Sequence, residues 1–162
     1  MTIAVGDKLP EATLIEKTEA GVAPVTVGEL TKGRKVVIFG LPGAFTGTCS
    51  TRHLPSFIGV AEKLRAKGIA DIACVAVNDP HVMKAWGDGA GAEEAGVRML
   101  SDAASELTGA LGLRFSRPEA GMFDRSKRYA MLVDDGVVRL LNLEKNAGEC
   151  ELSSGEAMLD AI

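Results

Sequence analysis

The sequence lacks the features that define several large classes of protein. It contains no internal repeat and no low-complexity tract, and no apolar run approaches the roughly 18 residues that a membrane span requires. No dense run of lysine or arginine occurs, and the net charge of -4 argues against a nucleic-acid-binding surface. The first residues form neither a basic nor a long apolar segment, so we expect no secretory signal. We therefore expect neither a membrane nor a nucleic acid as a partner.

The chain is also short, and cysteine is scarce in it. With 162 residues, of which 46% are hydrophobic, the chain can build one hydrophobic core but has no room for a second domain. We therefore expect a single domain over residues 1–162. Its three cysteines are an odd number without metal-type spacing, which fits a reducing compartment, and we expect a cytoplasmic protein.

The cysteines lack the neighbours that several thiol chemistries require. Arg52 stands three residues after Cys49, so the Cys-x-x-Cys dithiol of thioredoxin-type exchange is missing. None of the three cysteines is followed six residues later by the arginine that a cysteine phosphatase needs. No glycine-rich phosphate loop ending in Lys-Ser or Lys-Thr is present either. Dithiol exchange, phosphatase chemistry and nucleotide binding are therefore disfavoured.

What the sequence does contain is organised around residues 40–49, a turn with several glycines and a proline. The β-branched and aromatic run 35–39 before it predicts a buried strand. After it, apolar residues recur at helical spacing over 54–64, which predicts a helix. Cys49 therefore falls in or beside the first turn of this helix. Unpaired backbone N–H groups and the helix dipole stabilise a thiolate over a thiol at such a position.

Strand and helix patterns alternate along the rest of the chain. We expect strands at 12–15, 22–27, 72–77, 97–100, 129–133 and 137–141, a helix capped by Asp79, another that begins at Ser101 and Asp102, and a last one capped by Ser153 or Ser154. Pro55 predicts a kink roughly two turns into the helix after Cys49. The order predicts an α/β fold with a mixed central sheet and helices on both faces, its parallel strands first and a C-terminal β-hairpin plus helix last.

The turn and the helix start carry a resemblance to a known family. The pattern Pro42-x-x-x-Thr46-x-x-Cys49 matches the active-site pattern of the peroxiredoxins, and the string 42–50 followed by His53-Leu54-Pro55 resembles their type II, or peroxiredoxin-five, class. Similar strings follow in the right order over nearly the whole chain, at 77–80, 83–86, 100–102, 125–129 and 135–138. One departure is Gly47, where the class usually has proline.

The resemblance implies a thioredoxin-like fold, thiol peroxidase activity toward hydrogen peroxide and organic hydroperoxides, and no metal or organic cofactor. Cys49 would be the peroxidatic nucleophile, which attacks one peroxide oxygen and becomes a sulfenic acid. The Thr46 hydroxyl would hold the thiolate and the peroxide, and Pro42 would shield the pocket from water. Arg128, from the first strand of the C-terminal hairpin, would supply the positive charge. A homodimer formed through the loops that flank 42–45 is also implied.

The residues alone also allow simpler interpretations. A lone cysteine before an apolar helix, such as Cys49, is most often a packed small hydrophobe. The basic cluster of Arg125, Lys127 and Arg128 is most often a solvated face, and only the resemblance selects Arg128. His53 lies four residues after Cys49, but no second histidine or cysteine with metal-type spacing joins it, so we interpret it as a structural or interface residue.

The step that recycles the sulfenic acid leaves alternatives open. Cys150 lies near the position of the resolving cysteine in animal members of the class, and Cys74 matches a second cysteine of plant and bacterial members but falls in a strand expected to be buried. Our hypothesis is reduction by an external thiol, either glutathione with glutaredoxin or thioredoxin, in a protein of antioxidant defence. The alternatives are a peroxide-sensing redox relay protein without multiple turnover and a binding module that kept the motif.

Overall fold

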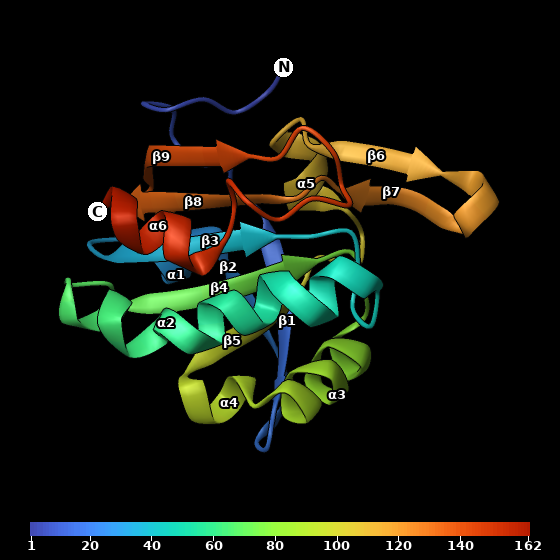
Figure 1. Cartoon of the computed structure of the whole chain (residues 1–162), viewed down its shortest axis with the longest axis horizontal. Helices are drawn as coiled ribbons and strands as arrows, with labels where there is room; N and C mark the ends of the chain where they lie inside the picture. Colours follow the sequence, from blue (N-terminus) through green and yellow to red (C-terminus); the bar gives the residue numbers. More distant parts are fainter.

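A seven-stranded mixed sheet forms the centre of the computed structural model, which describes all 162 residues (Figure 1). Its strands are β1 (Thr13–Thr18), β2 (Gly21–Thr26), β3 (Lys35–Gly40), β4 (Asp71–Ala76), β5 (Val97–Ser101), β8 (Tyr129–Asp134) and β9 (Val137–Leu143). They lie in the order β2-β1-β5-β4-β3-β8-β9. The strands β3, β4 and β5 pair in parallel, whereas β8 and β9 pair antiparallel as the expected C-terminal hairpin. The predicted mixed sheet is confirmed.

Helices cover both faces of this sheet. They are α1 (Val27–Thr31), α2 (Leu54–Ala66), α3 (Pro80–Ala90), α4 (Ala92–Ala95), α5 (Glu106–Ala110) and α6 (Gly155–Ala161). Residues of α2, α3, α4 and α6 belong to one hydrophobic cluster, and residues of α1 and α5 belong to a second. The strands contribute alternate side chains to the two clusters, as a sheet buried on both faces requires. None of these helices combines the length and the apolar character that crossing a membrane would take.

The start of α2 differs from the expectation. Residues Cys49–His53 form a π-helical turn, η1, in which the Leu54 N–H donates to the Cys49 carbonyl five residues earlier. Helical residues continue without a break from Gly47 through η1 into α2, so Pro55 lies about two turns into this helix. Pro55 has no N–H to donate to the carbonyl four residues earlier, and the π-helical turn ends at His53, two residues before it. The irregularity thus lies beside Pro55, in the turn that carries Cys49, and the kink itself stays a prediction.

Two pieces of the fold were not expected from the sequence. The first is a two-stranded ribbon of β6 (Arg114–Arg117) and β7 (Met122–Ser126), joined by the short 3-10 helix η2 (Pro118–Ala120), which projects from the body of the molecule (Figure 1). The second is the short helix α1, which begins at a capping box of Thr26 and Glu29. The helix expected from Ser101 and Asp102 begins later, at Glu106, with the Asp102 carboxylate accepting from N–H groups of its first residues.

Candidate active site

The sulfur of Cys49 is buried and faces a guanidinium group. Cys49 is the first residue of η1, directly after the turn that leaves β3, and its exposed fraction is 0%. Arg128 is 2% exposed, and its Nη2 donates to the Cys49 Sγ at 3.2 Å. The two residues that the resemblance selected for the thiol and the positive charge are therefore in contact. A cation at this distance stabilises a thiolate over a thiol.

Arg128 is held in one orientation by neutral acceptors. Its Nε and Nη2 donate to the Ala147 carbonyl at 3.0 and 2.8 Å, and its Nη1 lies 3.0 Å from the His53 Nδ1. No carboxylate forms an ion pair with Arg128, so its charge is not neutralised by an acidic side chain. The residue precedes β8 rather than lying on it, because β8 begins at Tyr129.

The tautomer of His53 follows from its two neighbours. A guanidinium has no acceptor, so the His53 Nδ1 accepts from Arg128, and the ring hydrogen is on Nε2, which donates to the Ser153 carbonyl at 2.9 Å. Burial, with the charge of Arg128 adding to it, lowers the pKa of His53 to about 3. His53 is therefore a neutral ring that packs between Arg128 and the C-terminal segment. The sequence left open whether His53 is a structural or an interface residue. Its exposed fraction of 0% favours a structural role.

The loop before Cys49 supplies the other two residues selected from the sequence. The Thr46 hydroxyl donates to the Gly43 carbonyl at 2.8 Å, so its hydrogen stays within the loop. Pro42 and Thr46 both line a pocket of about 260 Å³ that Arg128 also reaches. The remaining lining residues come from the same loop, from the β6–β7 ribbon and from the segment after β9: Gly47, Thr48, Phe115, Arg117, Met122, Ala147 and Gly148. Arg128 thus connects the open pocket with the buried sulfur.

Two further residues, which the sequence interpretation did not select for the site, fix the position of this loop. The Arg125 Nη1 donates to the Pro42 carbonyl at 3.0 Å, and the Asn78 side chain accepts from the Ala44 N–H at 2.9 Å. A Cβ atom at Gly43 would lie 2.5 Å from the Arg125 Nη1, so a larger residue there would displace this guanidinium. Arg125 belongs to the basic cluster noted in the sequence. Its sequence position alone could not show that its side chain holds this loop rather than pointing into solvent.

The two other cysteines are buried free thiols. Cys74 lies in the middle of β4 and is 0% exposed, as expected, and Cys150 is 1% exposed on the segment between β9 and α6. Burial raises the pKa of both thiols. Neither forms a disulfide with Cys49, so the role of each in recycling stays a prediction.

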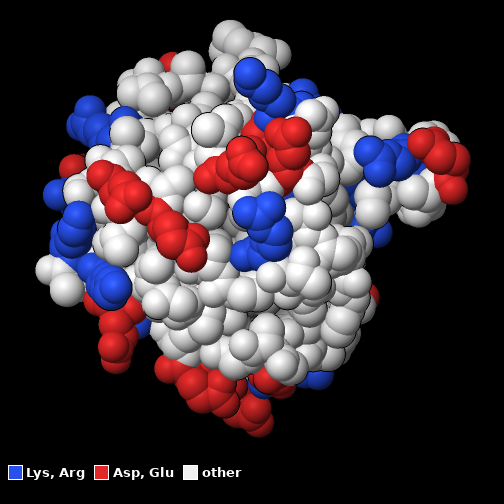
Figure 2. Space-filling view, in the orientation of Figure 1, with Lys and Arg blue, Asp and Glu red and all other residues white.

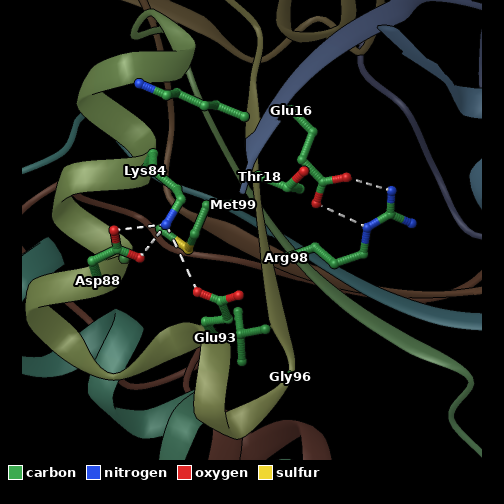
Figure 3. Close-up of a pocket in the computed structure, with 11 residues that line it drawn as sticks. Glu16, Thr18, Lys84, Asp88, Glu93, Gly96, Arg98 and Met99 are labelled. Atoms are coloured by element: carbon green, nitrogen blue, oxygen red, sulfur yellow. Dashed lines mark hydrogen bonds and ion pairs between the residues drawn. The ribbon is translucent and has the colours of Figure 1, made fainter. Parts of the chain in front are cut away.

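A second pocket, of about 160 Å³, lies between α3, α4, β1 and β5 and away from the thiol (Figure 3). Lys84 points into it and pairs with Asp88 at 2.7 Å, and Arg98 pairs with Glu16 at 2.9 Å. Most of the charged groups that line this pocket form ion pairs, and the remaining cation, Lys17, contacts the His81 ring instead. We assign no function to it.

A buried cysteine that faces a fixed guanidinium, at the point where a strand of an α/β sheet leads into a helix, defines a cysteine-dependent redox site. Comparison with known proteins specifies the class. The redoxin family model matches residues 4–159. Among curated proteins, the chain is 53% identical to the chloroplastic peroxiredoxin-2E-2 of Oryza sativa subsp. japonica, covering 99% of this chain and 73% of that protein, and 44% identical to peroxiredoxin-2D of Arabidopsis thaliana, covering 99% and 98%.

Solved structures agree with this assignment. The crystal structure of reduced Prx3 from Vibrio vulnificus in complex with H₂O₂ superposes with a TM-score of 0.93 at 47% identity, covering 99% of both chains. Peroxiredoxin 5 from Alvinella pompejana superposes with a TM-score of 0.83 at 34% identity, covering 98% of this chain and 97% of that one. The chain belongs to the redoxin family and is a type II peroxiredoxin, a thiol-dependent peroxidase with the expected thioredoxin-like fold.

Proposed function

We propose that this peroxiredoxin reduces hydrogen peroxide and organic hydroperoxides at Cys49 and is recycled by an external thiol. The single observation that carries the proposal is the 3.2 Å contact between the Arg128 Nη2 and the buried Cys49 Sγ. In the first step the Cys49 thiolate attacks one peroxide oxygen, an S–O bond forms and the O–O bond breaks. The departing oxygen takes up a proton and leaves as water or an alcohol, and Cys49 becomes a sulfenic acid.

The other site residues have roles that follow from their places. Arg128 contacts the sulfur and also lines the pocket, so its fixed donors stabilise both the thiolate and the negative charge on the departing oxygen. Thr46, beside it in the pocket, presents its hydroxyl oxygen as an acceptor for the hydrogen of the bound peroxide, since its own hydrogen is donated to Gly43. Pro42 covers the pocket with a side chain that carries no polar group.

An external thiol suits the recycling step better than Cys74 or Cys150. Both are buried, and their raised pKa values leave little thiolate at neutral pH. In the proposed sequence a thiol RSH attacks the sulfenic acid, so that a mixed disulfide forms and water leaves. A second RSH then releases Cys49 as a thiol and forms RSSR. Glutathione with glutaredoxin, or thioredoxin, would supply these electrons.

The surface beside the site favours a thiol that carries negative charge. A neighbouring pocket shares Phe115, Arg117, Arg128 and Ala147 with the pocket that Pro42 and Thr46 line, and Lys127 and Lys145 line it in addition. Its one carboxylate, that of Glu144, is buried and engaged by Ser153 and Glu151, whereas Lys127 and Lys145 are exposed and form no ion pair. Cations that surround an approach path raise the local concentration of an anionic reactant.

Peroxide consumption with a panel of reductants tests the proposal. The wild type and the Cys74→Ser and Cys150→Ser variants are expected to turn over many times with glutathione and glutaredoxin or with thioredoxin, and Cys49→Ser is expected to be inactive. One turnover followed by a stall with every reductant would replace the peroxidase cycle with the redox-sensor alternative. A stable Cys49–Cys150 or Cys49–Cys74 disulfide in the peptide map of the oxidised wild type would overturn the external-thiol cycle.

A second experiment tests the charge argument. In the Lys127→Gln/Lys145→Gln double variant, we expect a several-fold lower rate with glutathione at low salt and an unchanged rate with neutral 2-mercaptoethanol, because only the anionic thiol is attracted. Lys32→Gln, an exposed lysine at the end of α1, is the matched control. Equal losses with both thiols would contradict an electrostatic role for the two lysines.

We also propose that the protein is a cytoplasmic homodimer. Its three cysteines are all free thiols, which supports a reducing compartment. Phe45, in the loop before Cys49, is 63% exposed and lies 6.5 Å from Trp86 of α3 between ring centroids. In Figure 2, the surface over α3 and the start of α2 is largely free of charged side chains, unlike the rest of that face. An exposed aromatic beside an uncharged surface supports an interface between two copies.

A further inference from the structure

The segment 145–153, between β9 and α6, reaches the active site at three points. The Ala147 carbonyl accepts two hydrogen bonds from Arg128, and the Ser153 carbonyl accepts one from the His53 ring. The Gly148 carbonyl accepts from the Thr48 hydroxyl at 2.9 Å, in the residue that precedes Cys49. Residues that have no part in the peroxidase motif therefore hold the groups that surround the sulfur.

One buried carboxylate holds this segment in shape. Glu144 follows β9 directly and is 6% exposed. Its Oε2 accepts from the Glu151 N–H at 2.9 Å, from the Ser153 N–H at 2.7 Å and from the Ser153 hydroxyl at 2.6 Å, and no basic side chain pairs with it. At its other end, the Glu144 N–H donates to the Arg128 carbonyl at 3.0 Å. Glu144 thus ties both ends of segment 145–153 to each other and to the backbone of Arg128.

We propose that Glu144 is a positioning residue for peroxide reduction, which acts by fixing segment 145–153 so that its carbonyls orient Arg128 and His53 around Cys49. The proposal rests on the role proposed for Arg128. A carboxylate suits this position because it is acceptor-only, and all three groups that it meets are donors. Although burial alone would raise the pKa of Glu144, the hydrogen bonds from Ser153 and Glu151 lower it, so the charged form is the one that the segment requires.

The arrangement also explains how Arg128 stays available to the sulfur. A carboxylate placed directly on Arg128 would fix the guanidinium but would neutralise the charge that the thiolate and the departing oxygen need. Here Arg128 donates to the neutral Ala147 carbonyl. The negatively charged Glu144 does not contact the guanidinium and instead accepts hydrogen bonds from Ser153 and Glu151. The segment therefore orients Arg128 without neutralising its charge.

The test compares Glu144→Gln with Glu149→Gln. Glu149 lies in the same segment but is exposed, and its carboxylate accepts only from the Asn146 side chain, so it is the matched control. Trp86, the single tryptophan, donates to the Ser50 hydroxyl next to Cys49, so we expect its fluorescence to change on oxidation of Cys49 in a stopped-flow experiment. We expect the second-order rate constant with hydrogen peroxide to fall about tenfold in Glu144→Gln, because small displacements of catalytic groups are costly. It is expected to stay unchanged in Glu149→Gln.

A second measurement separates positioning from general loss of stability. In ¹⁵N spectra of the folded wild type, His53 is expected to show one tautomer, with the hydrogen on Nε2, and the Arg128 Nε–H is expected to exchange slowly with solvent. In folded Glu144→Gln, the tautomers are expected to mix and the Arg128 Nε–H to exchange faster. These signals do not depend on peroxide chemistry, so the positioning claim can succeed even where the proposed peroxidase cycle fails.

The proposal is overturned if folded Glu144→Gln keeps the wild-type rate constant, or if its rate falls while the His53 and Arg128 signals stay as in the wild type. Should Glu144→Gln fail to fold, Ser153→Ala carries the same test, because it removes the hydroxyl bond to Glu144 and leaves the bond from the Ser153 N–H in place. We then expect a two- to fourfold lower rate constant with partial mixing of the His53 tautomers. Unchanged signals and an unchanged rate in Ser153→Ala would contradict the proposal.

Discussion

At the scale of single residues, the surroundings of the Cys49 sulfur are set by what each neighbour can donate or accept. Arg128 offers only donors, and it meets one sulfur, one carbonyl oxygen and one ring nitrogen. His53 must therefore be neutral and must keep its hydrogen on the far side of the ring. A buried charge is retained at this site because each nitrogen of the guanidinium has a partner.

Replacing Arg128 by lysine tests this geometry. A single ammonium group cannot contact the Cys49 sulfur while it also meets the Ala147 carbonyl twice and the His53 ring. We expect the rate constant with hydrogen peroxide to fall by about 100-fold in Arg128→Lys, the size of loss that follows removal of one fixed donor from a reacting centre. Arg139→Lys, on an exposed arginine of β9, is the control and is expected to react like the wild type. A wild-type rate in Arg128→Lys would contradict the role given to the guanidinium.

His53 gives the protein a predictable dependence of stability on pH. The folded pKa of about 3 lies below the ordinary value of 6.5, so the unfolded chain binds a proton that the buried ring does not. The stability that His53 contributes is fully present above pH 6.5 and is lost progressively as the pH falls toward 3. From pH 8 to pH 5, this single group is expected to lower the free energy of unfolding by about 2 kcal/mol.

Urea unfolding of the wild type, His53→Gln and His81→Gln at both pH values measures this effect. His81 is exposed and is the only other histidine, so His81→Gln is expected to keep the wild-type pH dependence. The part of that dependence that His53 causes is expected to disappear in His53→Gln. The same pH dependence in all three proteins would show that the ring is not buried in its neutral form.

At the scale of elements, the path from β3 through the loop and η1 into α2 holds the site together. Gly40 ends β3 against the ring of Tyr129, the first residue of β8, which is 1% exposed. The next residues form the loop that Arg125 and Asn78 hold, and η1 then presents Cys49. A π-helical turn at this point is in keeping with the frequent occurrence of such turns at functional sites.

Two glycine substitutions of opposite effect test the packing of this path. A Cβ at Gly40 would overlap the buried Tyr129 ring, so Gly40→Ala is expected to lower the free energy of unfolding by roughly 1 to 3 kcal/mol. Gly59, inside α2, has open space where a Cβ would stand, so Gly59→Ala is expected to raise stability by about 1 kcal/mol. Denaturant unfolding measures both, and a neutral Gly40→Ala would mean that the ring does not close over β3.

The strands and most helices could be predicted from the sequence because their patterns are strong. The apolar runs at 35–39 and 72–77 are typical of strands buried on both faces. The N-cap Asp79 and the following Pro80 mark the start of α3 in the local sequence. The β6–β7 ribbon was missed because its residues are mostly polar and exposed, so no alternation of apolar and polar residues marks it. The sequence predicted an irregularity at Pro55 but did not specify a π-helical turn, because a missing N–H can be accommodated by a kink or by a π turn alike.

The same limit applies to the site. The resemblance to the peroxiredoxins, and no spacing of residues, selected Arg128, which the structure places in contact with Cys49 although the two are 79 positions apart in the chain. The roles of Arg125, Asn78 and segment 145–153 could not be predicted, because they act through backbone carbonyls and N–H groups that carry no signature in the sequence.

At the scale of the whole molecule, the sheet separates two cores, and the site lies where the strands β3 and β8 meet the projecting β6–β7 ribbon (Figure 1). The ribbon contributes Phe115, Arg117 and Met122 to the pocket, so the outermost part of the fold borders the proposed peroxide-binding pocket. The exposed Phe45 belongs to the same loop as Pro42 and Thr46, where the proposed dimer interface begins.

The oligomeric state is predicted to depend on Phe45. In Phe45→Glu a charged side chain would lie in the proposed interface, so we expect the wild type to sediment as a dimer and the variant as a monomer at the same concentration. Phe123→Glu is the matched control, because Phe123 is equally exposed but lies on the β6–β7 ribbon, and it is expected to stay dimeric. A wild-type monomer, or a dimer that persists in Phe45→Glu, would contradict the proposed interface.

The measurement that tests the central claim most directly is a map of where one equivalent of hydrogen peroxide oxidises the protein. The wild type is treated with peroxide in the presence of a reagent that traps sulfenic acids, and each of the three cysteine peptides is analysed by mass spectrometry. The trapped group is predicted to appear on Cys49, with Cys74 and Cys150 unmodified, because only Cys49 faces the fixed guanidinium. A trapped group on either of the other cysteines in place of Cys49, or none on any of them, would contradict the account.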